Sequence, residues 1–128
     1  MTNRIAVAAA LCGLVAGAGG VAVLHAAGAA QPKGYLVGEI DVHDMDTYRT
    51  YAAQAPAILA RHGGKYLARG GQTVSYEGAA PASRFVIVEF PTVAAARAFY
   101  ESPEYRAASQ IRQKASNSRM FLAEGFTP

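Results

Sequence analysis

The sequence predicts an α+β domain in which helices cover one face of an antiparallel sheet. Residues 35–42 alternate between apolar and polar side chains, residues 84–90 form an apolar run closed by a proline, and helical spacing occupies the stretches between strands. The expected order is β-α-β-β-α-β, the ferredoxin-like arrangement, which leaves the second face of the sheet without helices.

The first strand is expected over residues 35–42, and a helix should follow it. Asp44 or Asp46 can cap the start of this helix by accepting hydrogen bonds from its free N–H groups. Gly63-Gly64 should end it, because glycine adopts the left-handed stop conformation at low cost. Pro56 lies within the helix and predicts a kink, or two short helices, since proline lacks a backbone donor.

The remaining elements follow in order: a strand at 65–69, a short strand piece at 74–77, a strand at 84–90, a helix capped by Thr92 that ends near Tyr100, a helix capped by Ser102 that ends near Ala115, and a last strand at 119–126. Pro103 suits the first helical position after Ser102, and Glu104 complements the positive end of that helix.

The face of the sheet without helices should carry a mixture of apolar and charged side chains. Alternation places these residues there: Tyr35, Val37, Glu39, Asp41, Leu67, Arg69, Phe85, Ile87 and Glu89. Such a face is too apolar for water and too charged for a dry core. We therefore expect a second copy of the chain to cover it, giving a homodimer with the charges paired inside.

Residues 1–30 have the composition of an export segment. Arg4 is followed by an apolar run from Ile5 to Leu24 and then by the small residues 26–30, the three parts of a secretory signal peptide. The run 5–24 also has the length of a membrane span, so an uncleaved inner-membrane anchor is the alternative. Both interpretations export the domain at 31–128, to the periplasm or the medium, and the membrane is a partner only if the segment stays attached.

Composition narrows the chemistry of the exported part. Cys12 is the only cysteine, so disulfides and thiolate ligands are not expected in the domain. The formal net charge of +3 comes from interspersed charges rather than a basic block, so no nucleic-acid partner is expected. The acidic stretch 41–46 matches no metal-ligand spacing, and neither a metal nor a cofactor is expected.

Short motifs along the exported part occur together: Gly63-Gly64, Arg69-Gly70-Gly71, Glu77-Gly78, Arg84, Glu89-Phe90-Pro91, Ala95-Ala96, Tyr100 and Ser102-Pro103-Glu104-Tyr105. With this set the chain resembles the bacterial domain of unknown function family 1330, from about Lys33 to Phe126. The resemblance implies a dimeric α/β barrel, in which two ferredoxin-like units pack sheet to sheet. That superfamily includes heme-handling enzymes, cofactor-free monooxygenases, isomerases and stress proteins. Phe99 stands where that family often has a tryptophan.

Glu39, Arg69 and Glu89 form the leading candidate constellation. If all three face the barrel interior, the arginine could bind a carboxylate or enolate and a glutamate could move a proton. The alternative is a structural salt bridge that fixes the register of the dimer. Arg84 and Glu77 are expected to organise the turn between strands.

Aromatic residues and one histidine complete the candidates. Tyr48, Tyr51, Tyr100 and Tyr105 could line a ligand pocket between the helices and the sheet, or simply fill the core. His62 could shuttle a proton, although a histidine at a helix end also complements the negative end of the helix.

These residues predict an exported α/β-barrel protein that binds a small anionic or aromatic molecule in the barrel or in a cleft between elements. One alternative is a cofactor-free enzyme of the monooxygenase or isomerase kind, with a glutamate as base. Another is an envelope stress or interaction protein without catalysis.

Overall fold

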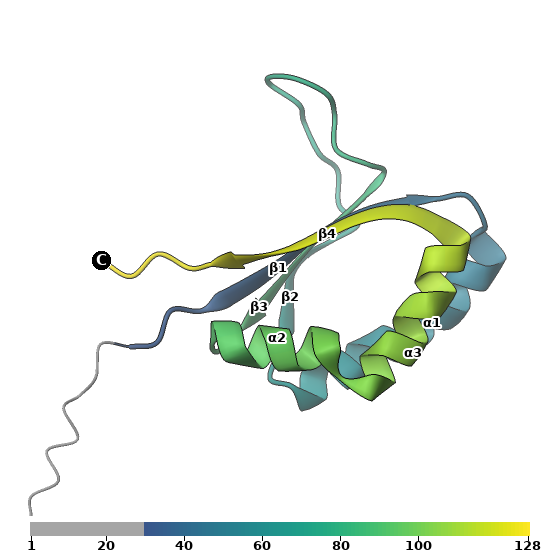
Figure 1. Ribbon diagram of the computed structural model, residues 1–128. Helices are drawn as coiled ribbons and strands as arrows, with labels where there is room; N and C mark the ends of the chain where they lie inside the picture. Colours follow the sequence, from purple (N-terminus) through teal and green to yellow (C-terminus); the bar gives the residue numbers. More distant parts are fainter. Residues whose placement is uncertain (1–29) are drawn as a thin grey trace, which may run out of the picture.

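The computed structural model describes residues 30–128, and the expected signal peptide or anchor falls on residues 1–29, which lie outside the described residues. The described chain forms a four-stranded antiparallel sheet of order β2-β3-β1-β4, with helices on one face (Figure 1). The elements are β1 Gly34–Val42, α1 Met45–Arg61, β2 Lys65–Arg69, β3 Arg84–Phe90, α2 Val93–Glu101, α3 Pro103–Ala115 and β4 Ser116–Glu124. The predicted α+β class and ferredoxin-like order are confirmed.

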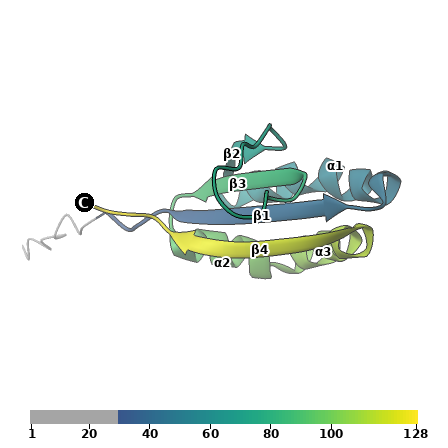
Figure 2. The same ribbon diagram turned by 90° about the horizontal axis from the view of Figure 1, so that it is seen from above.

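The register of β1 explains the two faces of the sheet. Leu36 and Ile40 are 5 % and 2 % exposed and point toward the helices, as the alternation predicts. Val37 lies between Ile87 of β3 and Phe121 of β4 on the opposite face. Seen from above, all four strands lie in front of the helices, so this second face is open (Figure 2).

Aromatic side chains connect the helices to the sheet. Phe99 of α2 has its ring centroid 4.2 Å from that of Tyr105 on α3 and 5.2 Å from that of Phe90 on β3. All three side chains are at most 1 % exposed. Burying an aromatic side chain of this size contributes about 1.5–3 kcal/mol, so this cluster is a main source of stability.

The helices begin at predicted caps. Asp44, not Asp46, caps α1 by accepting from the Thr47 amide at 3.1 Å, and Gly63 follows the helix with φ +76°. Pro56 does not divide α1 into two helices, since the helix continues to Arg61. The alternative of two short helices was wrong because packing holds α1 together across the missing hydrogen bond, and the kink stays a prediction.

One predicted strand and one predicted strand boundary were also wrong. Residues 74–77 form no strand but belong to an exposed loop, 70–83, that rises on the side of the sheet away from the helices (Figure 1). Val74 and Tyr76 are 73 % and 92 % exposed, and no neighbouring strand pairs with them. Strand β4 begins at Ser116, directly after α3, rather than at Arg119. Within residues 30–128, no helix is long and apolar enough to cross a membrane.

Candidate ligand-binding site

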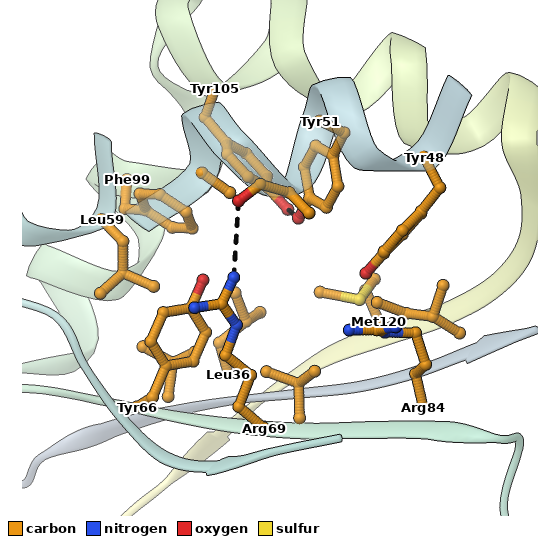
Figure 3. A pocket seen from close by; sticks show the side chains of 15 residues that line it. Leu36, Tyr48, Tyr51, Leu59, Tyr66, Arg69, Arg84, Phe99, Tyr105 and Met120 are labelled. Carbon is orange, nitrogen blue, oxygen red and sulfur yellow. Dashed lines mark hydrogen bonds between the residues drawn. The ribbon is translucent and has the colours of Figure 1, made fainter. Parts of the chain in front are cut away.

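A small cavity of about 40 Å³ lies between α1, α3 and the helix-covered face of the sheet (Figure 3). Its floor is apolar, with Leu36, Val86 and Val88 from the central strands. Aromatic and cationic side chains form its walls: Tyr48, Tyr51, Tyr66, Arg69, Arg84 and Tyr105. None of its lining residues is acidic.

Two buried tyrosine hydroxyls meet on the helix side of this cavity. Tyr51 lies on α1, Tyr105 lies in the first turn of α3, and their hydroxyl oxygens are 3.0 Å apart. The Ser102 hydroxyl accepts a hydrogen bond from the Tyr105 amide and thereby fixes the start of α3. Burial raises the pKa of both phenols, so both are neutral at physiological pH.

Arg69 reaches the cavity because β2 contains an irregularity. The register between β2 and β3 shifts between Tyr66 and Ala68, which places Arg69 opposite Val86. Since Val86 faces the helices, so does Arg69, and the expectation that Arg69 lies on the open face was wrong. A side-chain alternation without the bulge would have placed it on the other side.

The Arg69 guanidinium interacts with a carbonyl that Pro56 leaves free. Proline has no N–H, so the carbonyl of Ala52, four residues earlier in α1, lacks its helical partner. Arg69 Nη2 donates to this oxygen at 3.4 Å, a long and therefore weak bond (Figure 3). The same guanidinium lies 4.6 Å from the centre of the Tyr66 ring.

Arg84 forms a second cationic wall of the cavity. Its guanidinium carbon is 5.1 Å from the centre of the Tyr48 ring, a cation–π distance. Within residues 30–128, neither Arg84 nor Arg69 forms an ion pair. We expected Arg84 to organise a turn, so its place in the cavity wall was not predicted. The sequence did contain a signal for it, because Arg84 lies two and four residues before Val86 and Val88 in the same strand and so shares their helix-facing side.

The two candidate glutamates lie on the other face of the sheet. Glu39 accepts from Arg119 Nε at 3.0 Å. Glu89 is 3.0 Å from Lys33 Nζ and 3.3 Å from Lys65 Nζ. The expected constellation of Glu39, Arg69 and Glu89 is therefore not assembled within the chain, since the sheet separates the arginine from both carboxylates.

The partners of Glu89 set its charge state. The hydrogen bond from Lys33 holds the pKa of the Glu89 carboxyl below its ordinary value, and Lys65 acts in the same direction. A carboxylate with a lowered pKa is a weak base, so this environment suits a structural ion pair better than proton abstraction.

His62 and Tyr100 both lie outside the cavity lining. His62 occupies the C-cap position of α1, with its ring centroid 5.8 Å from that of Phe99 in an edge-on arrangement. Tyr100 lines two other recesses along β4 instead. Over residues 30–128, no three histidine, cysteine, aspartate or glutamate side chains gather in a way that could hold a metal ion.

Solved structures with the same fold include proteins of unknown and of known activity. A protein of unknown function from Rhodopseudomonas palustris is 21 % identical with a TM-score of 0.62, over 80 % of this chain and 89 % of that one. The cofactor-independent oxygenase SnoaB from Streptomyces nogalater is 18 % identical with a TM-score of 0.55, over 76 % and 96 %. A dimeric protein of unknown function from Bacteroides fragilis is 13 % identical with a TM-score of 0.51, over 73 % and 97 %.

These likenesses establish the fold and leave the activity open. No curated protein matches the sequence significantly. The family model described as Domain of unknown function (DUF1330) matches residues 33–126, which span the whole sheet and all three helices. The chain is therefore a member of the DUF1330 family.

Proposed function

We propose that this protein is an exported homodimer that binds a small aromatic anion in the cavity between α1, α3 and the sheet. The observation that carries the proposal is the pair Arg69 and Arg84, two cations on the wall of an aromatic cavity without an acidic lining residue. A planar ligand would stack on Tyr66 or Tyr48, and its negative charge would pair with the guanidinium groups.

Binding requires Arg69 to move. A cavity of about 40 Å³ has room for only a few water molecules, because each needs roughly 10–15 Å³. The Arg69 side chain is exposed and is held by one long hydrogen bond to Ala52. Exchanging this weak bond for a charge-assisted bond to an anion is favourable and enlarges the site.

The cavity supports binding better than glutamate-based catalysis. Its lining contains no aspartate, glutamate or histidine, and burial raises the pKa of Tyr51 and Tyr105, which keeps both phenols protonated. A cofactor-free enzyme with Glu39 or Glu89 as base would need its substrate on the open face, where both carboxylates are already ion-paired. SnoaB shares the fold, and its activity is a property of that protein.

The open face supports a dimer. Phe121, Val37 and Ile87 form an apolar row across three strands, and Ala68, opposite Ile87, continues it onto β2. Ion pairs flank the row, from Glu39 on one side and Glu89 on the other. An apolar centre with a polar rim is the usual composition of a protein interface, and pairing of two such sheets would form the barrel.

Export rests on the sequence of residues 1–30, with its cation, apolar run and small-residue end. Fractionation of the producing cells, followed by N-terminal sequencing of the protein, tests it. A mature chain that begins near Gln31 supports a cleaved signal peptide, and an intact chain in the membrane fraction supports the anchor.

Calorimetric titration tests the binding site. Salicylate and benzoate are suitable probes, with benzyl alcohol as the neutral comparison. Both anions should bind, and Arg69→Gln and Arg84→Gln should each weaken binding about tenfold or more, since a charged hydrogen bond contributes about 1.5–3 kcal/mol. Arg106→Gln removes an exposed cation on α3, away from the cavity lining, and should have no effect.

Native mass spectrometry of the protein from an exporting host complements the titration. A dimer that retains an aromatic acid supports the proposal and identifies the ligand. A dimer that stays empty and responds to neither probe contradicts it, and favours a stress or interaction role in the envelope.

A further inference from the structure

Arg112 is a buried cation outside the aromatic cavity. It lies in the last turn of α3, is 2 % exposed, and lines an open recess between α3 and β4. Its guanidinium carbon is 5.8 Å from the centre of the Tyr51 ring. Among the residues that the structure describes, its buried Nε has no hydrogen-bond partner.

Two serines bind this arginine without neutralising it. Arg112 Nη1 donates to Ser118 Oγ at 2.7 Å, and Ser118 Oγ lies 3.0 Å from Ser116 Oγ. Ser116 donates its proton to the carbonyl of Arg112 at 2.7 Å. Since a hydroxyl has one proton, Ser118 must donate to Ser116, which closes a ring of hydrogen bonds with no negative charge in it.

No carboxylate compensates the guanidinium. The other lining residues of the recess are Tyr100, Gln113, Asn117 and Met120, and no ion pair within residues 30–128 involves Arg112. The negative end of α3 and the face of Tyr51 stabilise the charge only in part. A buried charge with an unpaired donor is costly, and structures normally avoid it.

We propose that Arg112 forms a second, separate site that binds a small oxyanion, the carboxylate or phosphate of a metabolite, in the recess between α3 and β4. The anion accepts from Nε, and charge-assisted bonds of this kind favour carboxylates and phosphates. The side-chain amides of the exposed residues Gln113 and Asn117 also line the recess and are further donors. Met120 is the flexible side chain best able to admit the ligand.

The site can be tested on the full chain by following thermal unfolding while acetate or phosphate replaces sodium chloride at constant ionic strength. One of the two anions should raise the melting temperature along a saturating curve, by about 4 °C or more when the site is full. In the ¹⁵N–¹H spectrum of arginine-labelled protein, the same anion should shift the Nε–H signal of Arg112. Through-bond correlation along the arginine side chain and backbone assigns this signal to Arg112. The assignment therefore does not depend on a folded Arg112→Lys variant.

Ser118→Asp is the decisive variant, because it places a carboxylate next to Nη1. It should raise the melting temperature without added anion and abolish the response to acetate and phosphate. Ser118→Asn has a side chain of matched size without the charge and should retain the response. An Nε–H signal and a melting temperature that ignore both anions would overturn the proposal, as would a Ser118→Asp variant no more stable than Ser118→Asn. Salicylate binding in the aromatic cavity is measured independently, so failure of one site leaves the other testable.

Discussion

Gly34 lies where β1 passes closest to the start of α2. A Cβ atom there would lie 2.8 Å from the Thr92 carbonyl oxygen and 2.9 Å from the Ala96 Cβ, distances that real Cβ atoms do not show. We expect Gly34→Ala to lower the free energy of unfolding by about 1–3 kcal/mol, as overpacking does. Chemical denaturation measures this loss. Gly71→Ala is the control, since nothing lies within 4 Å of its Cβ position, and a Gly34→Ala variant as stable as Gly71→Ala would contradict the close approach.

The buried hydroxyl of Tyr51 predicts a pH dependence. Burial raises the pKa of Tyr51 above its ordinary value, near 10, so the folded protein retains a proton that the unfolded chain loses. Its contribution to stability is therefore complete below pH 10 and is lost as the pH rises further. Above pH 10 the free energy of unfolding of wild type should fall relative to that of Tyr51→Phe, by about 1.4 kcal/mol per pH unit. Urea denaturation between pH 8 and 11 tests this, and a difference independent of pH would contradict it.

Among the elements, α1 links a proline to the binding site. Pro56→Ala restores the amide that can bond the Ala52 carbonyl, so we expect the free energy of unfolding to rise by about 1–3 kcal/mol. The restored bond competes with Arg69 for the same oxygen. Arg69→Gln should then cost about 0.5–1 kcal/mol less in the Pro56→Ala background than in wild type. A double-mutant cycle measures this coupling, and strictly additive effects would show that Arg69 gains nothing from the free carbonyl.

Strands with clear alternation were predictable, and the short strand was not. Residues 84–90 form a long apolar run, in which the two-residue period of a strand placed Glu89 on the open face and Val88 in the core, as observed. Strand β2 has five residues and a bulge, too few positions for alternation to reveal the doubled residue. Arg69 was misplaced for that reason, and with it the expected site. The segment 74–77 contains Val74 and Tyr76, which favour strands, but pairing requires a neighbouring strand that sequence alone does not supply.

The proposed dimer would form through the open face of the sheet. Phe121 is 45 % exposed and lies beside Val37 in the central apolar row. If two sheets pack together through this row, a carboxylate at this position would be buried, and the neighbouring cation, Arg119, is already paired with Glu39. We expect Phe121→Glu to convert the dimer to a folded monomer, with the secondary structure seen by circular dichroism unchanged.

Sedimentation equilibrium measures this change in mass. Phe126→Glu is the matched control, because Phe126 is 91 % exposed and lies beyond the end of β4. That variant should remain dimeric. If Phe121→Glu also stays dimeric, the two copies do not associate through this face, and the open sheet must be covered differently or remain in solvent.

If Phe121→Glu is monomeric and still binds salicylate, each chain contains a complete aromatic cavity, in agreement with a lining that comes from one chain alone. Loss of both properties together would instead mean that dimer formation holds the cavity in its binding shape, since the floor residues Leu36, Val86 and Val88 lie on the same strands as the apolar row.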